Sequence, residues 1–188
     1  MKTCLVGCGG IAAVHGSVLT SGIDTEFVAA ADIKLEKAQS YAENFHTKPY
    51  PSLESMLEAE KPDVLHICTP HYLHVPMAIY SLERNINVFM EKPPAISFDQ
   101  LEELKKAAAK SDAQLGFCYQ NRYNASIRAA KDLIDSGKAG KVLGARAFVT
   151  WCRGAAYYTE SGWRGSLKTE GGGVLINQSV HTQDLLCF

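Results

Sequence analysis

The sequence has no long apolar run, no block of charge of one sign and no paired cysteines. None of its apolar stretches approaches about 20 residues, so no membrane-spanning helix is expected. The formal net charge is -1, without a basic block or an acidic tail, which argues against nucleic acid or a membrane as a partner. The six cysteines include no Cys-x-x-Cys pair and are interpreted as reduced core residues of a cytoplasmic protein.

Two further absences concern leader peptides and metals. The first predicted strand begins directly after Met1, so no signal peptide is expected ahead of it. A zinc site would need clustered Cys or His ligands, and the nearest candidate is the His71-x-x-His74 pair. Because no third ligand accompanies this pair, no metal site is predicted. One of the two histidines is instead expected to cap or line the turn after a strand.

What the sequence does contain is a glycine turn near its start. The apolar run Cys4-Leu5-Val6 leads into residues 7–12, which have the G-x-G-x-x-G/A spacing of a dinucleotide site, and a helix is predicted from there to about Thr20. The first glycine permits a sharp turn and the second lets a pyrophosphate approach the backbone. The helix N-terminus then offers unpaired N–H groups to the phosphates. The predicted cofactor-binding residues here are Gly7, Gly9, Gly10 and Ile11.

An acidic residue supports this interpretation. Residues 27–31 read as the second strand, which ends at Asp32, twenty residues after the last position of the glycine pattern. A carboxylate there can accept hydrogen bonds from both adenosine ribose hydroxyls and would repel a 2′-phosphate. NAD is therefore the predicted cofactor. NADP remains the alternative, because Lys34 lies close by and could soften the preference.

The first 120 residues alternate between apolar runs and amphipathic stretches. This order predicts an α/β fold, a doubly wound parallel sheet of six strands forming an NAD(P)-binding Rossmann domain over residues 1–120. Residues 49–51, Pro-Tyr-Pro, are taken as a break, and Ser52 and Ser97 as helix N-caps. The expected helices are 35–45, 52–57, 74–84 and 98–110, and the later strands are 64–68, 87–90 and 114–119.

Two turns follow buried strands and should border the cofactor, since ligands bind outside the carboxyl ends of parallel strands. In the second, prolines hold Lys92 in one extended geometry. A lysine there can hydrogen-bond a substrate oxygen or, with a pKa lowered by burial, exchange a proton. A salt bridge to a neighbouring residue is the structural alternative. The predicted cofactor-binding residues of these turns are Thr69, Pro70, His74, Glu91 and Lys92.

At these motifs the chain resembles a known family. The glycine turn, Cys68-Thr69-Pro70 and Glu91-Lys92-Pro93 are similar to those of the glucose–fructose oxidoreductase, inositol dehydrogenase and rhizopine-catabolism (Gfo/Idh/MocA) proteins. The resemblance implies an NAD(P)-dependent oxidoreductase. It also implies that Lys92 lies between nicotinamide and substrate as a catalytic residue.

Residues 121–188 are predicted to be the first part of an α+β substrate and oligomerisation domain. A helix is expected over 125–135, closing at Gly137, and a long strand over 142–151. Residues 152–170 read either as a loop over a small-molecule pocket or as a plain surface loop. Three glycines then lead a predicted helix in which Asn177 and His181, four apart, share one face.

This last run resembles the second signature of the same family. The resemblance implies that His181 transfers the substrate proton, which suits a side chain whose pKa lies near working pH. Asn177 stands where an aspartate is commoner and could orient the histidine or a substrate hydroxyl as a further catalytic residue. Trp163 and Arg164 resemble a pair near the nicotinamide and substrate in some members, and the resemblance implies that they are further cofactor-binding residues.

The function expected from these residues is hydride transfer between nicotinamide and a sugar, cyclic polyol or similar hydroxylated small molecule. Family members continue beyond the last helix, so the chain is expected to be part of a longer protein, truncated at its C-terminus, and the longer protein to be a homo-oligomer. Two alternatives stay open. One is a dinucleotide-binding regulatory protein without turnover, and the other is a glycosidase or lyase assisted by NAD.

Overall fold

The structure is a computed structural model that describes residues 1–22 and 24–188. The chain divides into two compact units, Met1–Phe117 and Cys118–Phe188, called the N-terminal unit and the C-terminal unit below. Among the residues described, no helix is both long enough and apolar enough to cross a bilayer.

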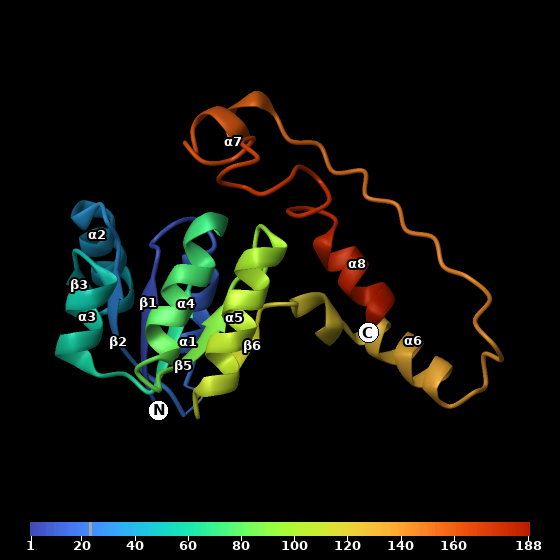
Figure 1. Cartoon of the computed structure of the whole chain (residues 1–188), viewed down its shortest axis with the longest axis horizontal. Helices are drawn as coiled ribbons and strands as arrows, with labels where there is room; N and C mark the ends of the chain where they lie inside the picture. Colours follow the sequence, from blue (N-terminus) through green and yellow to red (C-terminus); the bar gives the residue numbers. More distant parts are fainter. Residues whose placement is uncertain (23) are drawn as a thin grey trace. The chain divides into compact units, whose positions relative to one another are not determined.

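The N-terminal unit is built on one parallel sheet of six strands in the order β3-β2-β1-β4-β5-β6, with β3 at one edge and β6 at the other (Figure 1). This is the strand order of a dinucleotide-binding Rossmann fold, as the sequence predicts. The strands are β1 Lys2–Val6, β2 Glu26–Ala31, β3 Lys48–Tyr50, β4 Val64–Ile67, β5 Asn87–Met90 and β6 Leu115–Phe117.

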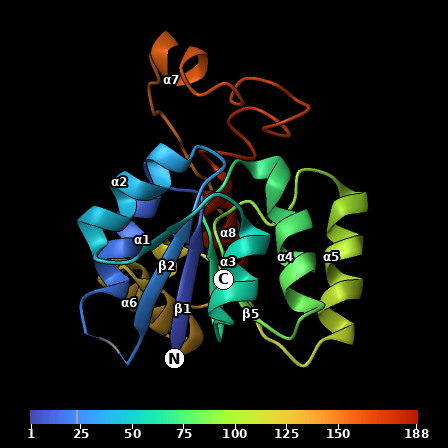
Figure 2. The same ribbon diagram turned by 90° about the vertical axis from the view of Figure 1, so that its left-hand side faces the viewer.

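Helices cover both faces of this sheet. Figure 2 shows α1 and α2 on one side and α3, α4 and α5 on the other. Alternate strand residues feed the two cores: Cys4 and Val6 pack toward α3–α5, whereas Leu5 packs toward α1 and α2. The helices are α1 Ala12–Leu19, α2 Leu35–Phe45, α3 Leu53–Glu60, α4 His74–Leu82 and α5 Phe98–Lys110, with a 3₁₀ turn, η1, over His71–Leu73.

Two helix starts follow the predicted capping. Ser52 Oγ accepts the Ser55 N–H at 3.1 Å, and Ser97 Oγ accepts the Gln100 N–H at 3.2 Å. Each serine thereby satisfies an N–H group that has no partner inside its helix. The predicted N-caps are confirmed.

One strand was not expected. β3 occupies Lys48–Tyr50, where the Pro49-Tyr50-Pro51 sequence predicts only a break. Proline cannot donate a backbone hydrogen bond, but β3 is an edge strand and needs partners on one side only. Its pairing with β2 brings Tyr50 opposite Ala31, beside the end of β2.

The C-terminal unit contains the 3₁₀ turn η2 (Gln120–Tyr123) and helices α6 (Ala125–Asp135), α7 (Ala155–Thr159) and α8 (Val180–Cys187). The predicted strand over 142–151 is wrong: these residues have no regular secondary structure. A strand is stable only when a neighbour satisfies its backbone groups, and the described residues of this unit contain no other strand. α7 lies inside the segment expected to be a loop.

The helix predicted after the glycines also begins later than expected. Gly171 and Gly172 have φ values of +92° and +157°, which interrupt any helix there. Residues 174–179 form successive turns, and the Ser179 N–H reaches back five residues to the Val174 carbonyl at 2.8 Å. α8 therefore starts at Val180. It contains His181 but not Asn177, so the expectation that one helix carries both is wrong.

Candidate functional site

The carboxyl ends of four neighbouring strands meet at one edge of the N-terminal sheet. Val6 is paired with Ala31 and with Ile67, and Ile67 with Met90. The ladder continues one residue further: Gly7 N–H donates to the Ala31 carbonyl at 2.8 Å and Glu91 N–H to the Ile67 carbonyl at 3.0 Å. The glycine turn, Asp32, the Thr69-Pro70 turn and the Glu91-Lys92 turn therefore share this edge.

The three glycines of the turn differ in their surroundings. Gly7 is buried at φ +93°, and a Cβ there would lie 2.7 Å from the Cys68 carbonyl carbon, so this position requires glycine. Gly9 and Gly10 are exposed, and a Cβ on either would meet no atom within 4 Å. The backbone of these two residues is thus open to a ligand. The next residue, Ile11, is the N-cap of α1, and its side chain makes no capping hydrogen bond.

The Asp32 carboxylate connects this turn to the end of β2. Its Oδ2 accepts the Cys8 N–H and its Oδ1 accepts the Lys34 N–H, both at 2.9 Å. Each carboxylate oxygen has a further lone pair, so the group can still accept hydrogen bonds from two ribose hydroxyls. An open glycine backbone beside a fixed carboxylate fits the phosphate and ribose groups of NAD.

His74 connects the other two turns of this edge. The ring is fully buried, with Nδ1 2.9 Å from the Pro93 carbonyl and Nε2 2.9 Å from the Thr69 carbonyl. Burial lowers the pKa of His74, while the two carbonyls act in the opposite direction. Both ring nitrogens lie at hydrogen-bond distance from backbone carbonyls. This arrangement is typical of a residue that holds the two turns together, rather than of a direct cofactor or metal ligand.

The Glu91-Lys92 turn rests on a buried hydrogen-bonded chain. His15 Nε2 lies 3.0 Å from Glu91 Oε1, and His15 Nδ1 lies 2.9 Å from His66 Nδ1. A carboxylate only accepts, so His15 donates to Glu91 and, when neutral, accepts from His66. Burial, and then the charge of His15, lowers the pKa of His66 to about 4. Lys92 itself is half-buried, and its N–H donates to Glu91 Oε2 at 3.3 Å.

Neither His15 nor His66 was expected at this site. His15 lies on the buried face of α1 and His66 in the middle of β4, 51 residues apart in sequence. A single histidine in an apolar element gives no sign of its partner, and only the fold brings the two together with Glu91.

In the C-terminal unit, Tyr157 packs against the arginine of the predicted Trp-Arg pair. The Arg164 guanidinium carbon lies 4.2 Å from the centre of the Tyr157 ring and 4.7 Å from that of Trp163. These are cation–π distances. The Thr169 hydroxyl donates to the Trp163 carbonyl at 2.5 Å, and this hydrogen bond joins the two ends of the loop over residues 163–169.

Asn177 belongs to the same group of residues. Its Nδ2 donates to the Tyr157 hydroxyl at 3.1 Å and to Glu170 Oε1 at 2.5 Å. Glu170 was not expected to take part, since nothing in the sequence distinguishes it from a surface glutamate ahead of the glycines. His181 is buried in the first turn of α8, and its ring meets Tyr119 edge to face at 6.3 Å between centres.

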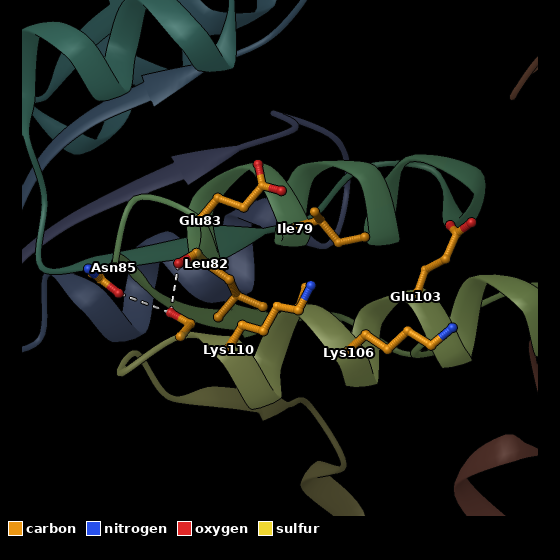
Figure 3. Close-up of a pocket in the computed structure, with 9 residues that line it drawn as sticks. Ile79, Leu82, Glu83, Asn85, Glu103, Lys106 and Lys110 are labelled. Atoms are coloured by element: carbon orange, nitrogen blue, oxygen red, sulfur yellow. Dashed lines mark hydrogen bonds between the residues drawn. The ribbon is translucent and has the colours of Figure 1, made fainter.

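The N-terminal unit also has a groove between α4 and α5 (Figure 3). At its floor the Ser111 hydroxyl donates to the Leu82 carbonyl at 2.6 Å, and the same Oγ lies 3.2 Å from Asn85 Oδ1. These residues precede β5 and β6, so this part of the groove lies at the amino ends of the strands, whereas the glycine turn lies at their carboxyl ends. It contains none of the predicted site residues.

Comparison with known proteins identifies both parts of the chain. The model of an oxidoreductase family with an NAD-binding Rossmann fold, GFO_IDH_MocA, matches residues 1–119. The model of a GFO/IDH/MocA C-terminal domain matches residues 127–188.

Individual relatives agree with these matches. The chain is 29% identical to D-glucoside 3-dehydrogenase of Escherichia coli K12, covering 100% of this chain and 53% of that protein. It is 30% identical to 1,5-anhydro-D-fructose reductase of Ensifer adhaerens, covering 93% and 51%. The WlbA dehydrogenase from Bordetella pertussis, solved with NADH and UDP-GlcNAcA, is 32% identical with a TM-score of 0.95, covering 99% and 54%.

The chain thus spans about half the length of the relatives that it matches. Within that half, the strand order, the open glycine turn and the fixed Asp32 carboxylate agree with the cofactor class of the matched family. The chain belongs to the Gfo/Idh/MocA oxidoreductase family, and residues 1–119 form its NAD-binding Rossmann fold.

Proposed function

We propose that the protein containing this chain is an NAD-dependent dehydrogenase or reductase that acts on a hydroxyl group of a sugar, sugar derivative or cyclic polyol. The observation that carries the proposal is the Asp32 carboxylate bound to the glycine turn at 2.9 Å, on the same sheet edge as the Glu91-Lys92 turn. The relatives are named as sugar dehydrogenases and reductases, which supports the substrate class.

In this proposal the N-terminal residues bind and orient the cofactor. Asp32 accepts the ribose hydroxyls, Gly9 and Gly10 lie against the pyrophosphate, and Thr69 and Pro70 border the nicotinamide side. When bound, the nicotinamide supplies the hydride acceptor. Lys92 donates a hydrogen bond to the substrate oxygen from which the proton is lost, and Glu91 holds the backbone of Lys92 in place.

The C-terminal residues are assigned to the substrate. His181 takes the hydroxyl proton during oxidation and returns it during reduction, so the carbon and its oxygen lose one hydride and one proton in total. Asn177 orients a substrate hydroxyl, and Trp163 and Arg164 line the sugar. Each of these roles is a prediction for the longer protein.

The cofactor part can be tested on the 188-residue chain itself. Titration with NADH and with NADPH, followed by nicotinamide fluorescence, should show saturable binding that is tighter for NADH. Preference for NADPH would contradict the role given to Asp32. Absence of binding in a chain with native circular dichroism would reject the cofactor site.

The reaction is tested on the longer protein with NAD and a panel of glucosides, hexoses, inositols and a UDP-sugar. Accumulation of NADH with one class identifies a dehydrogenase. Release of sugar or water without NADH would indicate an NAD-assisted glycosidase or lyase, and binding with no turnover would indicate a regulatory protein.

We also propose a homo-oligomer in the cytoplasm. Residues 142–151 expose apolar side chains, among them Leu143, Phe148 and Trp151, in a segment with no regular structure. Apolar patches of this kind are commonly covered by another chain. Light scattering after size exclusion should give a mass above that of one chain, and a monomer at high concentration would contradict the proposal.

A further inference from the structure

Two histidines lie behind the Glu91-Lys92 turn, and the proposed chemistry does not use them. His66 on β4 is opposite Phe89 on β5, and Glu91 follows two residues later, so these side chains leave the sheet on one face. Helix α1 brings His15 onto this face, with its ring centre 5.2 Å from that of His66 and 6.0 Å from that of Phe89. Packing therefore holds both histidine rings in place.

The hydrogen bonds of this group run in one direction. An ionised Glu91 carboxylate only accepts, so His15 Nε2, 3.0 Å from Glu91 Oε1, carries a hydrogen. His15 Nδ1 lies 2.9 Å from His66 Nδ1, and between two neutral rings one of these nitrogens must donate. A neutral His15 has its single hydrogen on Nε2, so His66 is the donor. His66 thereby fixes the tautomer in which His15 can donate to Glu91.

The other oxygen of Glu91 bonds to the residue proposed to contact the substrate. Oε2 accepts the Lys92 N–H at 3.3 Å, while His15 holds Oε1. Glu91 and His15 are each 7% exposed, and a carboxylate buried to this extent keeps its charge only when hydrogen-bond donors face it. Because the two oxygens turn together, the bond at Oε1 also determines where Oε2 points.

We propose that His15 is a positioning residue for Lys92. It donates to Glu91, keeps that carboxylate ionised and turned toward the Lys92 N–H, and so holds the backbone from which the lysine side chain reaches the substrate. His66 takes part by fixing the tautomer of His15. On the proposed function, on which this inference rests, Lys92 donates to the substrate oxygen, and neither histidine contacts the ligand.

The first test needs no substitution at the site. Long-range nitrogen-15 NMR of the 188-residue chain, labelled at histidine, reports which ring nitrogen of each histidine carries a hydrogen. At neutral pH the hydrogen should be on Nε2 of His15 and on Nδ1 of His66, with the signals identified by their loss in His15→Gln and His66→Phe. A bare Nε2 on His15 would show that it accepts from a protonated Glu91, and would overturn the inference.

Two substitutions separate hydrogen-bond donation from packing. His15→Gln places an amide N–H where the imidazole Nε2–H stood, whereas His15→Leu fills the buried position with apolar atoms and donates nothing. If His15 only packs against Phe89, leucine should be the better replacement. If His15 positions Lys92, glutamine should be better. Ser17→Ala, at an exposed position of the same helix, is the control and should behave as wild type.

The backbone N–H of Lys92 provides the measurement in the 188-residue chain. In a sample labelled at lysine, its nitrogen-15 signal is identified by its loss in Lys92→Arg. His15→Leu should shift this signal and speed its hydrogen exchange, and His15→Gln should restore most of both. The signals of lysines in α2 and α5 report that each variant is folded. A Lys92 signal unchanged in His15→Leu, or not restored by glutamine, would overturn the inference.

Turnover in the longer protein gives an independent measurement. His15→Leu should lower kcat roughly 10- to 100-fold with little change in KM, the effect of losing one charge-assisted hydrogen bond behind a catalytic group, and His15→Gln should recover most of it. Equal kcat in wild type and His15→Leu would also overturn the inference. Absence of turnover with every sugar would instead count against the proposed function, and the Lys92 signal would then decide the role of His15.

Discussion

The side-chain carboxylate of Asp32 accepts the backbone N–H of Cys8 at 2.9 Å, across 24 residues of sequence. This bond joins the residue proposed to choose the cofactor to the turn proposed to hold its phosphates. The same carboxylate also accepts the N–H of Lys34, so its orientation is fixed before any ligand binds. Preorganisation of this kind lowers the ordering cost of binding.

Asp32→Asn should weaken NADH binding roughly 10- to 100-fold, the loss of charge-assisted hydrogen bonds to a ribose. NADPH should lose much less, because the variant no longer repels a 2′-phosphate. Fluorescence titration with both nucleotides measures the two affinities. Asp112→Asn, at an exposed residue ahead of β6, is the matched control and should bind as wild type. Equal weakening for both nucleotides would contradict the discriminating role of Asp32.

Two glycines of the turn should respond in opposite ways to alanine. Gly7→Ala places a Cβ 2.7 Å from the Cys68 backbone at a φ of +93°, so it should destabilise the N-terminal unit by about 2–4 kcal/mol. At Gly9 a Cβ meets nothing within 4 Å, so Gly9→Ala should keep the melting temperature and weaken NADH binding instead. Thermal unfolding and nucleotide titration on both variants separate the two effects. Similar melting temperatures would show that the turn is looser than described.

Gly16, in the middle of α1, should reverse the usual effect of alanine on a helix. Gly to Ala in an exposed helix stabilises by about 1 kcal/mol. Here the added Cβ would lie 2.5 Å from the Tyr41 hydroxyl oxygen and 2.7 Å from the Phe45 ring, where α1 packs on α2. Gly16→Ala should therefore destabilise by roughly 1–3 kcal/mol in urea unfolding. Ala13→Gly, at an exposed position of the same helix, is the reference for the intrinsic cost. A Gly16→Ala chain more stable than wild type would disprove this packing.

The N-terminal unit was predictable because its signals are local. A glycine turn, an acidic residue after a strand and serine caps each act within a few residues of their own position. Apolar runs that alternate with amphipathic stretches predict strands that alternate with helices, and hence a parallel sheet. β3 was not predicted because prolines at positions 49 and 51 argue against a strand, and a strand containing proline is tolerated only at the edge of a sheet. The His15–His66 contact and the closure of the Thr69 and Pro93 turns by His74 depend on pairings between distant elements.

The C-terminal unit was predicted less well because its structure depends on contacts between residues that are distant in sequence. The run 142–151 has the composition of a strand, but a strand is defined by a partner, and this segment has none among the described residues of its unit. Asn177 and His181 have helical spacing, yet Gly171 and Gly172 and the five-residue turn at Ser179 keep the first of them outside α8. The hydrogen bond between Asn177 and Glu170 depends on that irregular backbone path, so the sequence spacing of the two residues does not predict it.

His66 and His74 make stability depend on pH. Burial lowers the pKa of His66 from 6.5 to about 4 in the folded chain, so protonation favours the unfolded state. The contribution of His66 is fully present above the unfolded pKa of 6.5 and is lost as the pH falls toward 4, up to about 3 kcal/mol. His74, whose pKa is also lowered by burial, acts in the same direction.

Urea unfolding at about pH 7 and pH 5 should therefore show a loss of stability on acidification, and His66→Phe should reduce that loss. Phenylalanine keeps a ring that packs on Phe89, at 5.1 Å between centres, and removes the titrating nitrogens together with the hydrogen bond to His15. His46→Asn, at an exposed left-handed position after α2, is the control and should keep the wild-type pH dependence. The same loss of stability in wild type and His66→Phe would mean that groups other than His66 govern acid unfolding.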